Sequence, residues 1–153
     1  GFGVTILAYD PYMNEEAAKE RKVQSVSLEE LLERSDVVSL HLPSTKETYH
    51  LINKENIGKM RDGAYLINTS RGALGDEDAL YEVLTCGKLS GAALDVFEKE
   101  PVTVDNPLFG LEQTVLAPHV SALTYETNYN GGLICAESII RVAQGQKPIY
   151  PLW

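Results

Sequence analysis

Three residues able to carry acid–base chemistry follow three successive stretches that are predicted to be strands. Arg71 comes directly after AYLINTS, Glu100 follows SGAALDVF, and His119 ends QTVLAPH. In an open parallel sheet, ligands bind just beyond the carboxyl ends of the strands. A guanidinium, a carboxylate and an imidazole at one such edge can bind an anionic substrate and transfer a proton.

The elements that must position these side chains alternate between short apolar strands and amphipathic helices. This alternation predicts a parallel sheet with helices on both faces. The near-continuous apolar run DVVSLHLP is typical of a strand buried on both faces. The predicted strands cover residues 4–9, 23–26, 36–43, 64–70, 90–97 and 113–119, and the predicted helices cover residues 14–21, 27–34, 53–60, 76–89 and 124–144.

The opening Gly1-Phe2-Gly3 does not fit the phosphate-binding glycine loop of a dinucleotide fold. A G-x-G-x-x-G loop follows a first strand and opens a helix, and its acidic ribose ligand comes roughly 20 residues later. Here Ile6 stands where the third glycine would fall, and Asp10 follows within one strand length. The opening is therefore interpreted as the turn before a second strand, and the predicted fold is an α/β, Rossmann-type, doubly wound parallel sheet that is incomplete at its N-terminal side.

Composition restricts the function classes further. The chain has 153 residues, 44% of them hydrophobic, and a formal net charge of −9, which disfavours nucleic-acid binding. It lacks an apolar run of the length that a membrane span needs, roughly 20 residues. Cys86 and Cys135 are interpreted as buried or incidental thiols of a reducing compartment, and no metal site is expected. The predicted location is the cytoplasm.

Three ordered motifs, NTSRGALGDEDAL, GAALDVFEKEP and LAPHVSALTYE, resemble the NAD-dependent D-isomer-specific 2-hydroxyacid dehydrogenases. The resemblance covers essentially the whole chain. It implies that residues 1–122 form most of an NAD-binding domain and that residues 123–153 form a C-terminal helix and tail returning towards a substrate domain. It also implies a first strand and a glycine loop upstream of Gly1.

The resemblance assigns catalytic roles to Arg71, Glu100 and His119. Arg71 would hold the substrate carboxylate, His119 would be the acid and base, and Glu100 would pair with His119. A structural ion pair for Arg71 and a satisfied strand-end histidine for His119 are the alternatives. Because the family carries its catalytic glutamate directly before the proline, Glu98 is interpreted as a solvated loop charge.

The resemblance also implies a set of cofactor contacts. Asp10 would accept hydrogen bonds from the adenosine ribose and repel the 2′-phosphate of NADP, although Asp-Pro is also a common turn. Asp95 would meet the nicotinamide carboxamide, and His41 and His50 are interpreted as structural. The expected cofactor-binding residues are Asp10, Pro43, Thr48, Thr69, Ser70, Arg71, Asp95, His119 and Ser121.

The protein is predicted to be an oxidoreductase that transfers a hydride between NAD and a small D-2-hydroxy acid or 2-oxo acid. It is also predicted to be a homodimer. The alternative is a non-catalytic NAD-binding or assembly module derived from the same family. In the strand order 3-2-1-4-5-6, a chain that starts at the second strand lacks the central strand. The facing edges of VTILAY and DVVSLHL would then be unpaired, so the chain alone is expected to be inactive. It is also expected either to aggregate or to be ordered only where an upstream segment or another chain fills the gap.

Overall fold

The computed structural model describes residues 3–151, so Gly1 and Phe2 of the predicted opening turn lie outside the described residues. The chain divides into two compact units, Gly1–Pro118 and His119–Trp153. This division falls shortly before the boundary at 122/123 that the sequence predicts. The assignment of these segments as an NAD-binding domain and a returning helix stays a prediction.

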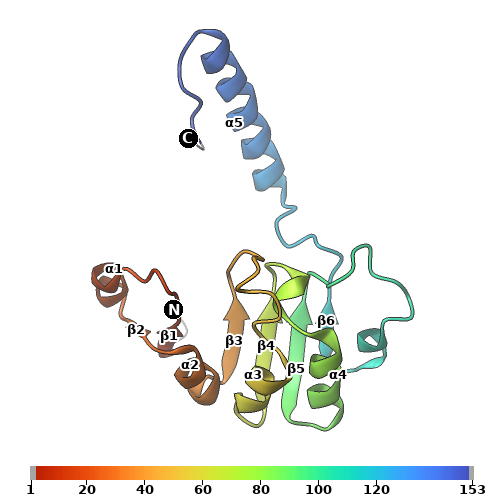
Figure 1. Cartoon of the computed structure of the whole chain (residues 1–153). Coiled ribbons are helices and arrows are strands. Elements are labelled where there is room, and N and C mark those ends of the chain that lie inside the picture. Colours follow the sequence, from red (N-terminus) through yellow and green to blue (C-terminus); the bar gives the residue numbers. More distant parts are fainter. Residues whose placement is uncertain (1–2, 152–153) are drawn as a thin grey trace. The chain divides into compact units, whose positions relative to one another are not determined.

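The N-terminal unit alternates strands and helices along the chain, and every strand pairing in it is parallel (Figure 1). This arrangement confirms the predicted α/β class. The strands are β1 (Ile6–Ala8), β2 (Val23–Ser25), β3 (Val37–Leu40), β4 (Ala64–Asn68), β5 (Leu89–Leu94) and β6 (Thr114–Leu116). The helices are α1 (Glu15–Glu20), α2 (Leu28–Arg34), α3 (Lys54–Lys59) and α4 (Glu77–Thr85), with short 3-10 turns η1 (Gly72–Leu74) and η2 (Pro107–Gly110).

The described strands form two separate sheets, one with the order β1-β2 and one with the order β3-β4-β5-β6. No ladder joins β1 to β3 within residues 3–118, which is the place where the sequence predicts a missing central strand. In the larger sheet Leu40 pairs with Asn68, Asn68 with Leu94, and Leu94 with Leu116. The carboxyl ends of the four strands are therefore in register, and the loops that follow them leave from one edge.

Polar side chains start each helix of the N-terminal unit. Asn14, Ser27, Asn53 and Asp76 each accept a hydrogen bond from a backbone N–H in the first turn, at 3.0 to 3.1 Å. Ser27 and Asp76 are the first residues of two predicted helices, and the structure makes them the N-caps of α2 and α4. Such a cap stabilises a helix by about 0.5–2 kcal/mol relative to alanine, which matters for helices of two turns or less.

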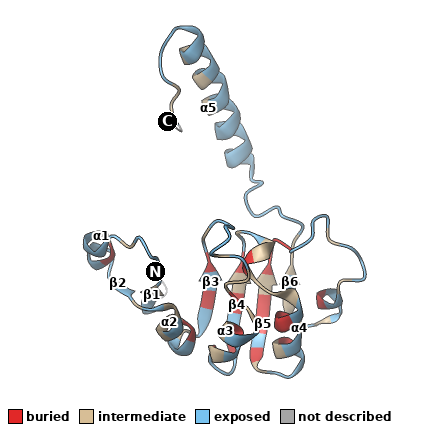
Figure 2. Cartoon of the chain, viewed as in Figure 1, coloured by how far each residue is buried: buried red, intermediate tan, exposed pale blue. Residues whose placement is uncertain are grey.

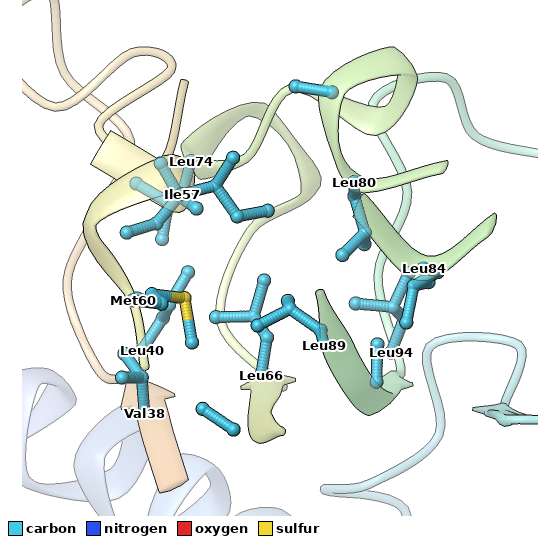
Figure 3. Close-up of a cluster of buried hydrophobic side chains, with 14 of the residues drawn as sticks. Val38, Leu40, Ile57, Met60, Leu66, Leu74, Leu80, Leu84, Leu89 and Leu94 are labelled. Carbon is cyan, nitrogen blue, oxygen red and sulfur yellow. The ribbon is translucent and has the colours of Figure 1, made fainter. Parts of the chain in front are cut away.

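The hydrophobic core lies on one face of the larger sheet, beneath α3 and α4. Figure 2 shows the buried positions along β3, β4 and β5, and Figure 3 shows the side chains that fill the space between sheet and helices. Full burial of each large aliphatic side chain contributes about 1.5–3 kcal/mol. The main contributors are Leu32, Val38, Leu40, Ile57, Met60, Leu66, Leu74, Leu80, Leu84, Leu89 and Leu94.

The opposite face of this sheet is open to solvent in the described residues. Val37, Tyr65 and Val115 are 52%, 50% and 72% exposed. The prediction that DVVSLHLP is buried on both faces is wrong, because β3 alternates between the inward Val38 and Leu40 and outward neighbours. The physical reason is that α3 and α4 cover one face only.

The C-terminal unit consists mainly of α5 (Tyr125–Ala143), as predicted, with Thr124 as its N-cap. Within the described residues, no side chain of α5 is buried. Cys135 on α5 and Cys86 after α4 are both exposed free thiols, so of the two interpretations, buried or incidental, the buried one does not hold. No helix among residues 3–151 combines the length and apolar character that crossing a membrane requires.

We expect the 153-residue chain to self-associate in solution, because its sheet carries exposed valines and an unpaired edge at β3. The substitution Val37→Lys places a charge on that edge strand and should shift the chain towards monomer. Sedimentation velocity over a series of protein concentrations measures the change. Val104→Lys, which adds the same charge to a loop residue that is 96% exposed, is the control. A monomeric wild-type chain, or an equal response of both variants, would contradict the expectation.

Candidate active site

The turn that carries Arg71 is tied to the ends of two strands. Asn68, the last residue of β4, is 3% exposed, and its Oδ1 accepts a hydrogen bond from the Ser70 N–H at 3.0 Å. Its Nδ2 donates to the Arg71 carbonyl at 2.9 Å. The Ser70 hydroxyl donates to the carbonyl of Leu40 at the end of β3, at 2.7 Å. The backbone at Arg71 is therefore fixed from both β3 and β4.

The Arg71 side chain lies at the surface of this strand edge. Its Nη1 donates to the Ser70 carbonyl at 2.6 Å, which holds the guanidinium close to its own turn. A guanidinium carries five N–H donors in a planar fork, so an exposed Arg71 can also bind a carboxylate. The neighbouring Thr69 is exposed at the same edge.

Gly72 brings the Arg71 turn into direct contact with the loop that follows β5. A Cβ at Gly72 would lie 1.9 Å from the carbonyl carbon of Phe97 and 2.4 Å from the backbone nitrogen of Glu98. Both atoms belong to the backbone, so no side-chain rotation could relieve the overlap. Only glycine permits the two segments to approach this closely.

The loop after β5 holds two of the predicted site residues. Asp95 is 3% exposed, and its N–H donates to the Asn68 carbonyl at 3.0 Å, which continues the β4–β5 ladder. Glu100 is exposed, and its Oε1 accepts a hydrogen bond from the Phe97 N–H at 3.0 Å. The structure therefore brings the segments that carry Arg71 and Glu100 together.

Glu98 is exposed, as the sequence predicts, but its carboxylate is also held by contacts with other elements. Its Oε1 accepts a hydrogen bond from the Glu77 N–H at 3.0 Å, at the start of α4. Its Oε2 lies 3.1 Å from Nε2 of His50. The helix N-terminus supplies a backbone donor and a favourable dipole, and these hold the exposed carboxylate in place.

The predicted adenosine side of the cofactor site lies in other loops. Asp10 follows β1, is exposed, and its Oδ1 accepts a hydrogen bond from the Tyr12 N–H at 2.8 Å, so it forms the turn that Asp-Pro favours. The Thr48 hydroxyl donates to the Pro43 carbonyl at 2.8 Å and accepts from the Thr45 N–H at 2.8 Å. These bonds close the loop after β3.

His119 and Ser121 belong to the C-terminal unit, whereas Arg71 and Glu100 belong to the N-terminal one. His119 is exposed, and its backbone has a φ of 57°, in the left-handed region that non-glycine residues seldom adopt. The pairing of His119 with Glu100 stays a prediction.

Sequence reasoning missed the residues that hold the site together, namely Asn68, Gly72, Glu77 and Glu98. Two of them left a signal in the sequence. An asparagine at a strand end before a Ser-Arg-Gly turn favours side-chain bonds to its own backbone, and a glycine next to a charged site residue can mark a close backbone approach. The hydrogen-bond partners of Glu77 and Glu98 are distant in sequence, so these two residues left no signal in the sequence.

Comparisons with known proteins show which family the sequence resembles. The sequence profile described as "D-isomer specific 2-hydroxyacid dehydrogenase, NAD binding domain" matches residues 1–121. A glyoxylate reductase of Korarchaeum cryptofilum is 48% identical over 97% of this chain and 45% of its own length. A D-3-phosphoglycerate dehydrogenase of Archaeoglobus fulgidus is 46% identical over 93% of this chain and 27% of its own.

The structural comparison points the same way. The crystal structure of a D-lactate dehydrogenase of Treponema pallidum superposes with a TM-score of 0.86 at 36% identity, over 96% of this chain and 48% of that one. The chain thus spans less than half the length of the relatives it matches.

The contact at Gly72 can be tested with a matched pair of glycines in one turn. Gly72→Ala should destabilise the chain by about 1–3 kcal/mol, the usual cost of overpacking, because backbone atoms must move. Gly75→Ala meets no atom within 4 Å and should change stability little. Urea unfolding of both variants measures the difference. If the two variants unfold at the same midpoint urea concentration, the Gly72 contact is not rigid.

Proposed function

The chain belongs to the D-isomer-specific 2-hydroxyacid dehydrogenase family, as part of its NAD-binding domain, and we propose that the whole protein interconverts a small D-2-hydroxy acid and its 2-oxo acid. The observation that carries this proposal is the direct contact between the Arg71 turn and the Glu100 loop at the carboxyl edge of the sheet. That contact supports a site in which an anion-binding group and a proton-transfer partner act on one substrate.

The residues at the strand edge fit NAD. Asp10 follows β1 and has an exposed carboxylate, which can accept hydrogen bonds from ribose hydroxyls and which repels a 2′-phosphate. The Pro43–Thr48 loop follows β3, the Thr69–Ser70 turn follows β4, and the buried Asp95 follows β5. When bound, NAD takes up or supplies the hydride.

Arg71 would bind the substrate through its carboxylate. The planar fork of guanidinium donors matches the two oxygens of a carboxylate, so one contact fixes both the position and the orientation of the substrate. The hydrogen bonds from Asn68 and Ser70 hold the backbone beneath this fork, which limits its displacement. A rigid anchor of this kind supports the proposed role, because orientation of the substrate is a large part of catalysis.

His119 would transfer the proton. In the direction of reduction it donates a proton to the carbonyl oxygen of the 2-oxo acid, and in oxidation it removes the proton from the hydroxyl. Glu100 would accept a hydrogen bond from the other ring nitrogen, which fixes the tautomer and stabilises the charged ring. The exposure of both side chains supports access to a substrate.

The assembly and location of the protein are further parts of the proposal. The exposed apolar residues Val37, Tyr65 and Val115 support association of the sheet with other surfaces, and we propose a homodimer. The exposed free thiols of Cys86 and Cys135 support a reducing compartment such as the cytoplasm.

In the whole protein, His119→Ala should lower kcat for reduction of a 2-oxo acid by NADH by about 10²-fold or more, because no other group would supply the proton. His41→Ala is the matched control, since His41 also follows a strand but bonds to Ser39 at 2.9 Å. Steady-state kinetics of both variants decide the role. A His119→Ala enzyme that keeps most of its kcat would remove His119 from the mechanism.

We also expect NAD to be preferred to NADP, with Asp10→Ala narrowing the preference, because the variant loses the charge that repels the 2′-phosphate. The ratio of kcat/KM for the two cofactors in the whole protein measures this. Asp105→Ala, which removes an exposed loop carboxylate, should leave the ratio unchanged. Equal use of both cofactors by the wild-type protein would overturn the ribose role of Asp10.

A further inference from the structure

Glu98 lies at the centre of a set of contacts that the proposed reaction does not use. Glu98 and Glu77 exchange reciprocal hydrogen bonds: the Glu77 N–H donates to Oε1 of Glu98 at 3.0 Å, and the Glu98 N–H donates to Oε1 of Glu77 at 2.6 Å. Oε2 of Glu77 also accepts from Nδ2 of Asn106 at 2.8 Å. The loop after β5 is thereby attached to the first turn of α4 and to the segment before η2.

His50 extends this set to the loop after β3. Its Nε2 is buried and makes no hydrogen bond of good geometry within the described residues, so the Glu98 carboxylate 3.1 Å away is the group that offsets its burial. The His50 N–H donates to the carbonyl of Ala73 at 2.8 Å, next to the Arg71 turn. The His50 backbone has a φ of 49°. The Tyr49 ring stacks on the His50 ring, with 4.0 Å between the two ring centroids. This strained conformation persists because contacts on several sides hold it.

The peptide group between Phe97 and Glu98 joins the two proposed functional side chains. It lies against Gly72, next to Arg71, with no room for a Cβ. The Phe97 N–H, which belongs to the preceding peptide group, donates to the carboxylate of Glu100. Whatever fixes this peptide group therefore fixes Arg71 and Glu100 relative to each other.

We propose that Glu98 is a positioning residue: its carboxylate, held between His50 and the N-terminus of α4, fixes the Phe97–Glu98 peptide group and so sets the geometry of Arg71 and Glu100. The inference rests on the proposed function, because it assumes that Arg71 and Glu100 act on the substrate. Glu98 itself touches neither substrate nor cofactor in this assignment.

The first test measures the loop directly and needs no activity. In Glu98→Ala, amide hydrogen exchange of the segment 96–100 in the whole protein should rise by about tenfold or more, because the carboxylate contacts to Glu77 and His50 are lost. Exchange in β4 should not change. Glu112→Ala removes an exposed carboxylate from the turn before β6 and is the matched control. Unchanged exchange in segment 96–100 of Glu98→Ala would overturn the proposal whatever the kinetics show.

The second test separates positioning from general stability. Glu98→Ala should lower kcat by about 10-fold to 10²-fold, the scale that a small misplacement of a catalytic group produces, with little change in KM for NADH. Glu98→Gln keeps one acceptor oxygen for the Glu77 N–H and an amide donor for a neutral His50, so it should recover most of this loss. A Gln variant as impaired as the Ala variant would overturn the proposal.

A double-mutant cycle tests whether Glu98 acts in part through Glu100. In the Glu100→Gln background, Glu98→Ala should cause a smaller further loss of kcat than in the wild-type protein, because one of the two groups that it positions is already disabled. Full additivity of the two losses would overturn the positioning role. If Glu100→Gln alone leaves kcat unchanged, the role of Glu100 in the proposed function is wrong, and the Glu98 proposal falls with it. A Glu98→Ala enzyme with normal kcat, alongside an impaired Glu100→Gln enzyme, overturns the Glu98 proposal only.

Discussion

The close approach of Gly72 to the Phe97–Glu98 peptide group is the constraint on which the rest of the site depends. Loops at the ends of different strands are ordinarily independent of each other, and their relative position varies with each one's own mobility. Here two backbones meet without any side chain between them. The loops after β4 and β5 are thereby joined into one rigid segment, and the buried Asn68 attaches that segment to the sheet.

The larger sheet explains why such a segment can exist at all. Its parallel strands end in register at Leu40, Asn68 and Leu94, so three loops leave from one line. The core beneath α3 and α4 fixes the strands themselves, because each buried aliphatic side chain is held on several sides by its neighbours. The site therefore lies at the carboxyl edge of a sheet that is packed on one face, while the exposed Val37 and Val115 lie on the other face.

Sequence patterns predicted most of this fold, because its elements begin and end at local signals. Asp76 and Ser27 cap their helices through bonds to residues three positions away, and such signals are visible in a short window. The exposed face of β3 could not be predicted, since the pattern of DVVSLHLP records a buried environment that the described residues do not supply. Contacts between distant segments were also invisible, so the hydrogen bond of Glu98 to a residue 21 positions away could not be predicted.

The parallel pairing of every described strand also affects how the chain reaches this structure. Each pair of neighbouring strands is separated in sequence by a crossover, so no ladder can form between adjacent segments of the chain. The chain must therefore lose the entropy of closing a long loop before any strand hydrogen bond forms, which makes such topologies slow to fold. The helix caps shorten this search, because a crossover that already contains a formed α4 brings β4 and β5 together over a smaller span than a disordered one. Residues such as Asp76 thus influence the rate of folding as well as the final stability.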